Sequence, residues 1–196
     1  ADASLDSGKG SKNSGNTSGD AGKDIDAGKK AFAEKDYATA EAAFRKALEK
    51  SPDNADAHFF LGRTLDAQGK KDAAMAEYRR VLEKEPDHAR ANYYLGRLLY
   101  QAQKYGDAER HFKKSTAADA QFAPAQYSLG LAQEKQGKGG EALKAYKKAG
   151  ELDGKLTQAH FNSAIILKKE RSYDDALAEL AKAGGGADVD YQRGEI

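Results

Sequence analysis

Histidines are the first side chains to consider for chemistry, because imidazole is a common metal ligand and general base. The chain has four of them, His58, His88, His111 and His160. None belongs to a His-x-x-x-His or His-Glu-x-x-His pattern, which would place two groups on one helix face, and the chain has no cysteine. His58 and His160 share one position of a sequence repeat but lie three repeats apart. The sequence therefore predicts no metal site, and surface or packing roles for the histidines.

Carboxylates and phosphate-binding motifs also give no catalytic pattern. Asp174 and Asp175 are adjacent, but they stand at an expected helix start, where negative charge favours the helix dipole. The run from Lys9 to Ser11 resembles the end of a phosphate loop, yet it lacks the Gly-x-x-x-x-Gly-Lys-Ser/Thr spacing and a preceding strand. We therefore predict that the protein is not an enzyme and carries no cofactor.

The overall charge excludes one class of partner. The chain has 32 basic and 31 acidic residues among its 196, which leaves a net charge of +1. Binding to nucleic acid would need a clear basic excess, so no nucleic acid partner is expected. No apolar run approaches the roughly 18 residues of a membrane span, so no membrane-spanning segment is predicted.

A repeated unit positions the side chains from about residue 24 onward. Leu-Gly pairs begin at Leu61, Leu95 and Leu129, which are 34 residues apart. An alanine series and a series of large residues keep the same interval. Their members are Ala40, Ala74, Ala108, Ala142 and Ala176, and Phe44, Tyr78, Phe112, Tyr146 and Leu180. Five copies run in phase without an insertion or a deletion.

Each copy predicts two amphipathic helices. In the second copy, apolar residues recur at three- and four-residue steps over residues 57–68 and again over 72–85, with Gly69 in the turn between them. Pro86 ends the second helix, because proline cannot continue the helical hydrogen bonds. Small residues such as Gly62 are expected to let the two helices approach closely, while large ones such as Tyr78 fill the space between neighbouring pairs.

With a 34-residue period, Leu-Gly in the first helix, Ala and then an aromatic in the second, and a closing proline, the chain resembles the tetratricopeptide repeat family. The resemblance implies an all-α fold, a right-handed α-solenoid of antiparallel helix pairs. Three segments follow: a flexible Gly/Ser-rich tail over residues 1–23, five repeats over 24–183, and a Gly-rich C-terminal tail over 184–196. The pattern with which some family members clamp a chain-terminal carboxylate matches no window of this sequence.

The resemblance also implies a binding surface, because the first helices of such arrays line a concave groove that takes a segment of a partner protein. Carrying the groove positions over one by one gives a set of aromatic and arginine side chains. The set is Phe59, Arg63, Tyr93, Tyr94, Arg97, Tyr100, Tyr127 and Phe161. Aromatic rings beside arginine are frequent anchors of peptide sites, and packing between the helices is the alternative role for the rings.

The partner's chemistry follows from charge along the expected groove. This charge favours a protein or peptide segment of acidic or aromatic character. In the last three copies the cations are Arg90, Arg97, Lys135, Lys168 and Lys169, against Glu134. An ordinary solvated surface is the alternative.

The two ends of the sequence carry further expectations. The start at Ala1-Asp2-Ala3 suits a chain from which a leader was removed, which favours a periplasmic or extracellular location, in a bacterial cell-envelope complex, over a cytoplasmic one. Beyond the last repeat, ten residues follow three glycines, too few for a full capping helix. Ile166, Leu177 and Leu180 are candidates for an uncovered face, through which the protein would self-associate as a structural assembly; this is the alternative to the adaptor role.

Overall fold

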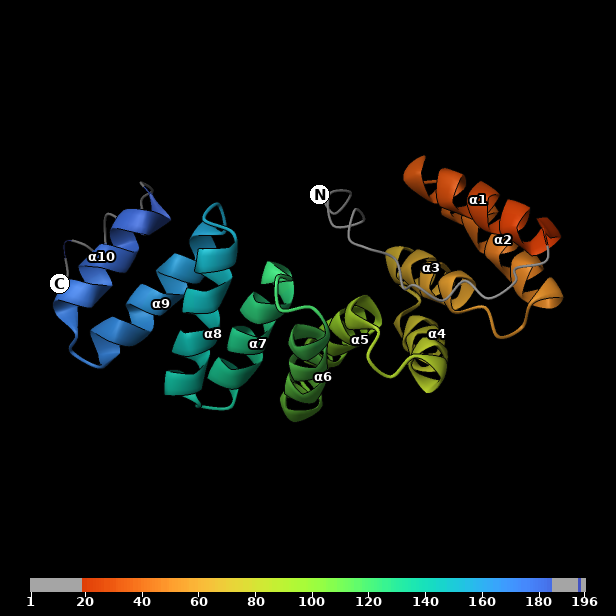
Figure 1. The fold of residues 1–196 in the computed structure, drawn as a ribbon. Coiled ribbons are helices and arrows are strands. Elements are labelled where there is room, and N and C mark those ends of the chain that lie inside the picture. Colours follow the sequence, from red (N-terminus) through yellow and green to blue (C-terminus); the bar gives the residue numbers. More distant parts are fainter. Residues whose placement is uncertain (1–18, 185–193, 195–196) are drawn as a thin grey trace. The chain divides into compact units, whose positions relative to one another are not determined.

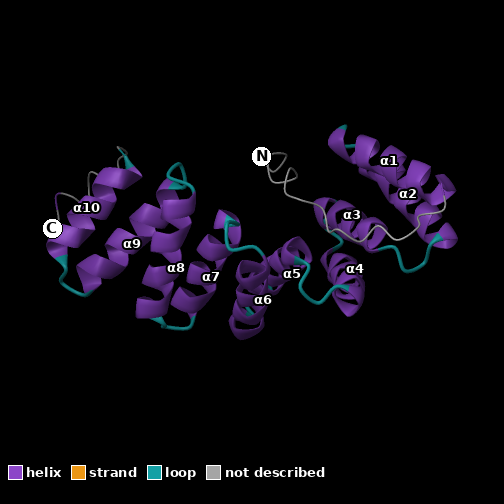
Figure 2. Cartoon of the chain, in the orientation of Figure 1, coloured by secondary structure: helices purple, strands orange, loops and turns teal. Residues whose placement is uncertain are grey.

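The structure is a computed structural model, and it describes residues 19–184 and Gly194. These residues form ten α-helices and no strand, joined by short loops (Figure 2). The helices are α1 (Gly19–Ala33), α2 (Tyr37–Lys50), α3 (Ala55–Ala67), α4 (Lys71–Lys84), α5 (Ala89–Gln101), α6 (Tyr105–Ala118), α7 (Ala123–Lys135), α8 (Gly139–Leu152), α9 (Thr157–Lys169) and α10 (Tyr173–Ala183). None of these described helices combines the length and apolar character that crossing a membrane requires.

The chain divides into two compact units, one up to Ala91 and the other from Asn92 onward. The first unit holds the pairs α1/α2 and α3/α4, and the second holds the pairs α7/α8 and α9/α10 together with α6 and most of α5 (Figure 1). Each pair corresponds to one copy of the sequence repeat. The chain is therefore an all-α solenoid built from helix pairs.

A contact between glycine and a large ring closes most pairs. A Cβ atom added at Gly62 would lie 2.8 Å from the Tyr78 ring of the same pair, so no larger residue fits there without displacement. The same contact recurs at Gly28 with Phe44, Gly96 with Phe112, and Gly130 with Tyr146. In the last copy, Ala164 packs against Leu180 instead. Alanine is larger than the glycine of the other copies, and leucine is smaller than their aromatic rings.

One packing expectation needs correction. The Tyr78 ring lies on Gly62 within its own pair and does not only fill the space between pairs. Between the first two pairs, Phe44 of α2 and Phe60 of α3 stack at 5.8 Å between ring centroids. The large ring of a copy therefore contacts the glycine of its own pair, and in the case of Phe44 it also contacts the next pair.

The turn inside each pair has one residue with a positive φ, at the same position in all five copies. Gly69 and Gly137 adopt φ of 78° and 75°, which glycine does without strain. Lys35, Gln103 and Arg171 adopt φ of 62°, 60° and 61° at the equivalent places. The turn geometry is thus set by the repeat and imposed on three residues that disfavour it.

The first helix begins earlier than the sequence suggests. It starts at Gly19, so residues 19–23 of the segment assigned to the N-terminal tail are helical. Ala21 is fully buried, and Lys50 of α2 forms ion pairs with Asp20 at 3.1 Å and with Asp24 at 2.6 Å. The rest of that segment lies outside the described residues, as does the C-terminal tail apart from Gly184 and Gly194.

Candidate functional site

In the first unit, Phe59 lies inside the helix packing. It is 4% exposed, and its ring centroid lies 5.3 Å from that of Phe60, 6.1 Å from that of Tyr78 and 5.1 Å from that of His88. Ile25, one repeat earlier, is buried as well. These contacts match the packing role, and contact of Phe59 with a partner stays a prediction.

Two cations of the first unit lie over aromatic rings. The Arg63 guanidinium carbon is 4.7 Å from the centroid of the Phe32 ring, and the residue is buried. Lys29 Nζ is 4.6 Å from the Phe60 centroid and 3.9 Å from an Asp56 oxygen. Cation–π attraction stabilises such positions, so Arg63 has a structural partner in Phe32 besides any role in binding.

In the second unit, the two adjacent tyrosines of α5 belong to an aromatic core. Tyr93 and Tyr94 are buried, with 5.2 Å between their ring centroids. Tyr93 also contacts the rings of Phe112 and Phe122, at 6.1 and 5.0 Å. Arg97 is only partly buried, and its guanidinium carbon lies 5.1 Å from the Tyr94 centroid.

The remaining aromatic candidates are partly exposed. The Tyr100 ring meets Tyr105 edge to face at 5.2 Å, and the Tyr127 ring lies 5.5 Å from that of Tyr146. Burial raises the pKa of the Tyr127 hydroxyl, which also accepts a hydrogen bond of 3.3 Å from Asn162 Nδ2. Phe161 packs against the cluster around Leu180. The Tyr127 hydroxyl is therefore neutral, and the rings of Tyr100, Tyr127 and Phe161 offer partly exposed apolar area.

The candidates thus separate by exposure. Phe59, Arg63, Tyr93 and Tyr94 are buried, whereas Arg97, Tyr100, Tyr127 and Phe161 are partly exposed. The partly exposed four all belong to the second unit, on α5, α7 and α9. Leu131 and Ile165, one turn along α7 and α9, are partly exposed too.

Sequence reasoning missed a polar pair that links the two helices of three copies. His58 Nδ1 is 2.6 Å from a Glu77 oxygen, and His160 Nδ1 is 2.7 Å from a Glu179 oxygen. In the third copy the order is reversed, with His111 Nδ1 2.9 Å from Asn92 Oδ1. Each pair spans 19 residues, so a search for complementary polar residues at that fixed separation would have found them.

Two glutamates tie neighbouring pairs together. Glu109 of α6 is buried and accepts hydrogen bonds from Lys138 Nζ at 2.6 Å and Gln136 Nε2 at 2.9 Å, both from the next repeat. Burial alone would raise the pKa of Glu109, but its hydrogen bonds to Lys113, Lys138 and glutamine outweigh burial and lower the pKa to about 2. Two repeats earlier, Glu41 makes the same kind of contact with Lys70 at 2.8 Å.

Metal chemistry has no support in the described part of the chain. Residues 19–184 contain no group of three or more His, Cys, Asp or Glu side chains that could hold a metal ion. The histidines found here bind carboxylate or amide groups of the protein itself.

Comparison with known families supports the repeat assignment directly. Two family models described as "Tetratricopeptide repeat" match, one over residues 31–84 and the other over 63–123 and 95–156. Together they cover residues 31–156. No curated protein matches the chain significantly.

Several solved structures share the fold. MamA from Desulfovibrio magneticus RS-1 is 20% identical, with a TM-score of 0.75 over 86% of this chain and 95% of that one. PilF from Pseudomonas aeruginosa is 26% identical, with a TM-score of 0.75 over 85% and 77%. YrrB, described as a TPR protein with an unusual peptide-binding site, is 18% identical, with a TM-score of 0.74 over 88% and 91%.

Proposed function

Because the chain belongs to the tetratricopeptide repeat family, we propose that it is a non-catalytic adaptor or assembly scaffold. It binds a segment of a partner protein on the face formed by the first helices of its repeats. The fold shared with YrrB, whose description includes a peptide-binding site, supports this role. A place in a bacterial cell-envelope complex stays a prediction from the sequence.

The observation that carries the proposal is the row of partly exposed side chains on first helices of the second unit. Tyr127 and Phe161 occupy one repeat position, and Arg97, Leu131 and Ile165 occupy another, one turn further along. Apolar and aromatic side chains that stay partly open at equivalent positions offer a continuous contact area. The second helices α6 and α8 carry mostly charged residues on their exposed positions.

The same helices indicate the chemistry of the partner segment. Arg97, Lys135 and Lys168 are the cations at or beside this row, and Glu134 is its acidic residue. Glu134 accepts a hydrogen bond of 2.7 Å from the Tyr146 hydroxyl, so one of its oxygens is already used within its own pair. A segment with acidic and aromatic residues therefore suits the surface best.

Site-specific photocrosslinking tests the proposal. A photoreactive phenylalanine analogue replaces Ile165 of α9 in one variant and the exposed Lys144 of α8 in a matched control. We expect the partner to crosslink at position 165 and not at 144. Crosslinking only at position 144 would assign binding to the second helices instead.

Self-association is the second candidate function, favoured by one feature of α10. Tyr173 and Leu177, four residues apart, are 45% and 40% exposed and are the large hydrophobic residues that the described chain leaves exposed. The expectation for Ile166 and Leu180 was wrong, because they are 6% and 0% exposed and pack on Tyr146 and Ala164.

Light scattering over a wide concentration range tests self-association. It should show a mass that rises with concentration, and Leu177→Glu should abolish this rise. A constant monomer mass would contradict this function.

A further inference from the structure

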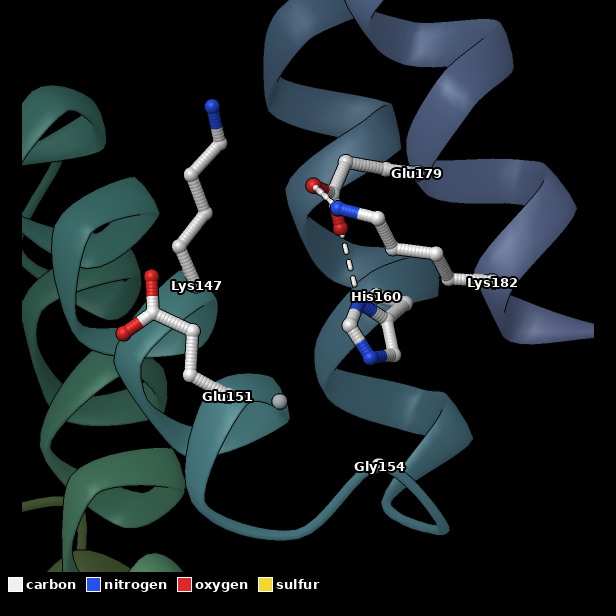
Figure 3. A pocket seen from close by; sticks show the side chains of 7 residues that line it. Lys147, Glu151, Gly154, His160, Glu179 and Lys182 are labelled. Carbon is white, nitrogen blue, oxygen red and sulfur yellow. Dashed lines mark hydrogen bonds and ion pairs between the residues drawn. The ribbon is translucent and has the colours of Figure 1, made fainter.

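A pocket opens between α8, α9 and α10. Its volume is about 530 Å3, and Figure 3 shows the side chains that line it. Lys147 and Glu151 come from α8, His160 from α9, and Glu179 and Lys182 from α10, while Gly150 and Gly154 complete the lining. The pocket therefore brings a histidine together with two residues of each charge.

The histidine in this pocket is held in a fixed orientation. His160 is 7% exposed, and its Nδ1 lies 2.7 Å from a Glu179 oxygen. Lys182 Nζ donates to the other Glu179 oxygen at 2.9 Å. Burial would raise the pKa of Glu179, but Lys182 and His160 outweigh it and lower that pKa below its usual range. Glu179 is thus a carboxylate, so Nδ1 is the ring nitrogen that carries a hydrogen.

The other ring nitrogen, Nε2, forms no hydrogen bond with any described residue. Figure 3 shows it on the side of the ring that faces the loop at Gly154. A buried imidazole with one end fixed and the other open to a pocket is poised to bind a ligand.

An earlier part of the chain contains the same cluster in a closed form. Three repeat lengths before His160 stands His58, whose Nδ1 binds Glu77 at 2.6 Å just as His160 binds Glu179. Arg45, Glu49 and Arg80 correspond to Lys147, Glu151 and Lys182. In the closed cluster, however, His58 Nε2 donates to the Pro52 carbonyl oxygen at 2.8 Å.

Two glycines distinguish the open cluster from the closed one. Gly150 replaces the equivalent of Leu48, and Gly154 replaces the equivalent of Pro52. A Cβ atom at Gly150 would lie 2.5 Å from His160 Cε1, so only glycine lets the ring take this position against α8. An added Cβ at Gly154 would meet nothing within 4 Å. At these glycines the open cluster therefore lacks the carbonyl partner that Pro52 gives to His58 Nε2.

In the closed cluster, the partner of the histidine Nε2 is a carbonyl oxygen. An acceptor oxygen is therefore the expected partner of His160 Nε2 in a ligand. The charges of the pocket lining indicate the charge of the ligand as well. Within the lining, Lys182 already pairs with Glu179 at 2.9 Å. Lys147 forms no ion pair with a described residue, whereas Glu151 lies 3.5 Å from Lys148. One negative group placed between His160 and Lys147 would restore neutrality.

We propose that this pocket binds a carboxylate, which accepts a hydrogen bond from His160 Nε2–H and pairs with the Lys147 ammonium. Charge-assisted hydrogen bonds of this kind are strong relative to neutral ones. A polypeptide C-terminus and an acidic side chain are the two sources of such a carboxylate.

Titration by NMR, with the histidine ring nitrogens observed in the intact chain, tests the proposal. Three probes are added: N-acetylleucine with its free carboxylate, N-acetylglutamate α-amide with a side-chain carboxylate, and N-acetylleucine amide with none. We expect saturable shifts of the His160 ring resonances with at least one carboxylate probe, and none with the uncharged amide. Preference for the first probe assigns a chain terminus, preference for the second assigns an acidic side chain, and equal response assigns any carboxylate.

His58 provides the matched internal control, because it has the same bond to a glutamate and residues of the same charge at the equivalent positions, but its Nε2 already donates to Pro52. Its ring resonances should not move with any probe. Equal shifts at His58 and His160, equal binding of the amide, or no binding would each overturn the proposal.

Two variants separate binding from folding. Lys147→Ala should weaken carboxylate binding severalfold, while Arg45→Ala at the equivalent place should leave it unchanged. Gly154→Pro introduces the residue of the closed cluster at a loop position whose φ is not positive, so the fold should persist while binding is lost. Unchanged binding in both Lys147→Ala and Gly154→Pro would overturn the assignment of the pocket.

Discussion

At the scale of single residues, the close approach of the two helices in a pair depends on a missing side chain. Gly62 lies so near the Tyr78 ring that an added Cβ would be only 2.8 Å from it. Tyr78 is fully buried, so the ring cannot move outward into solvent. Because the interior is densely packed, replacing the glycine must either push the two helices apart or displace the Tyr78 ring.

Replacing Gly62 by leucine should destabilise the fold by about 1–3 kcal/mol or more, the usual cost of overpacking. Gly140→Leu is the matched control, because a Cβ at Gly140 meets nothing within 4 Å and leucine favours the helix more than glycine does. Thermal and urea unfolding of the two variants measures the difference. Equal stability of Gly62→Leu and the wild type would show that α3 and α4 are paired differently.

Replacing a residue in one of the strained turns should raise the stability of the protein, whereas Gly62→Leu should lower it. Gln103 is exposed and has φ of 60°, a conformation that costs an ordinary residue about 1–2 kcal/mol. Gln103→Gly should therefore stabilise the protein by about 0.5–1 kcal/mol, after the extra entropy of glycine in the unfolded chain is subtracted. Gln101→Gly, at the last residue of α5, should instead destabilise the protein, by up to about 1 kcal/mol. Urea unfolding distinguishes these outcomes, and a loss of stability in Gln103→Gly would contradict the turn geometry.

At the scale of helices, charged contacts supplement the apolar ones between successive pairs. Glu109 of α6 reaches the turn of the next pair through Lys138 and Gln136, and Glu41 of α2 does the same through Lys70. The pKa of each glutamate is about 2, well below the ordinary value of 4.5. The ionised form is thus the one that the folded state favours.

This pKa depression predicts a pH dependence of stability. A carboxyl group with a lowered pKa in the folded state contributes stability above about pH 4.5, and this stability is lost as the pH falls toward 2. Glu109→Gln should be less stable than the wild type at neutral pH and should lose less stability over that pH interval, by on the order of 2 kcal/mol. Urea unfolding at a series of pH values is the measurement. Parallel pH profiles of the two proteins would rule out the lowered pKa.

Helix order and pairing could be predicted from the sequence because each copy repeats the same steric contact. The helices expected over 57–68 and 72–85 are observed as α3 and α4, within two residues at each end. The start of α1 could not be predicted, because glycine-rich composition concealed the buried Ala21 and the ion pairs of Asp20 and Asp24 with Lys50. Local composition does not reveal a contact made with a distant helix.

The candidate site was predictable only in part, for a related reason. Spacing identified which side chains share a repeat position, but exposure depends on the neighbouring copies. Tyr93 is 8% exposed because Phe112 and Phe122 cover it, whereas Tyr127 at the same repeat position stays partly open. Gly150 and Gly154 line the pocket at His160, and the missing partner of His160 Nε2 is recognised only by comparison with the bond from His58 to Pro52.

At the scale of the whole molecule, the first-helix face is expected to bind a segment of a partner protein. Arg97 tests this claim best, because it is partly exposed, lies over the Tyr94 ring and stands on α5 among the partly exposed aromatic residues. A guanidinium there is able to pair with a carboxylate of the partner while an adjacent ring packs on an apolar side chain.

The decisive measurement is calorimetry of Arg97→Ala with the partner identified by crosslinking, alongside Arg110→Ala on the exposed side of α6 as the matched control. We predict that Arg97→Ala weakens binding by about 1–3 kcal/mol, the loss of a hydrogen bond to a charged group, with nearly unchanged thermal stability. Arg110→Ala should bind as the wild type does. Unchanged affinity of Arg97→Ala would contradict binding at the first-helix face and assign it to another face.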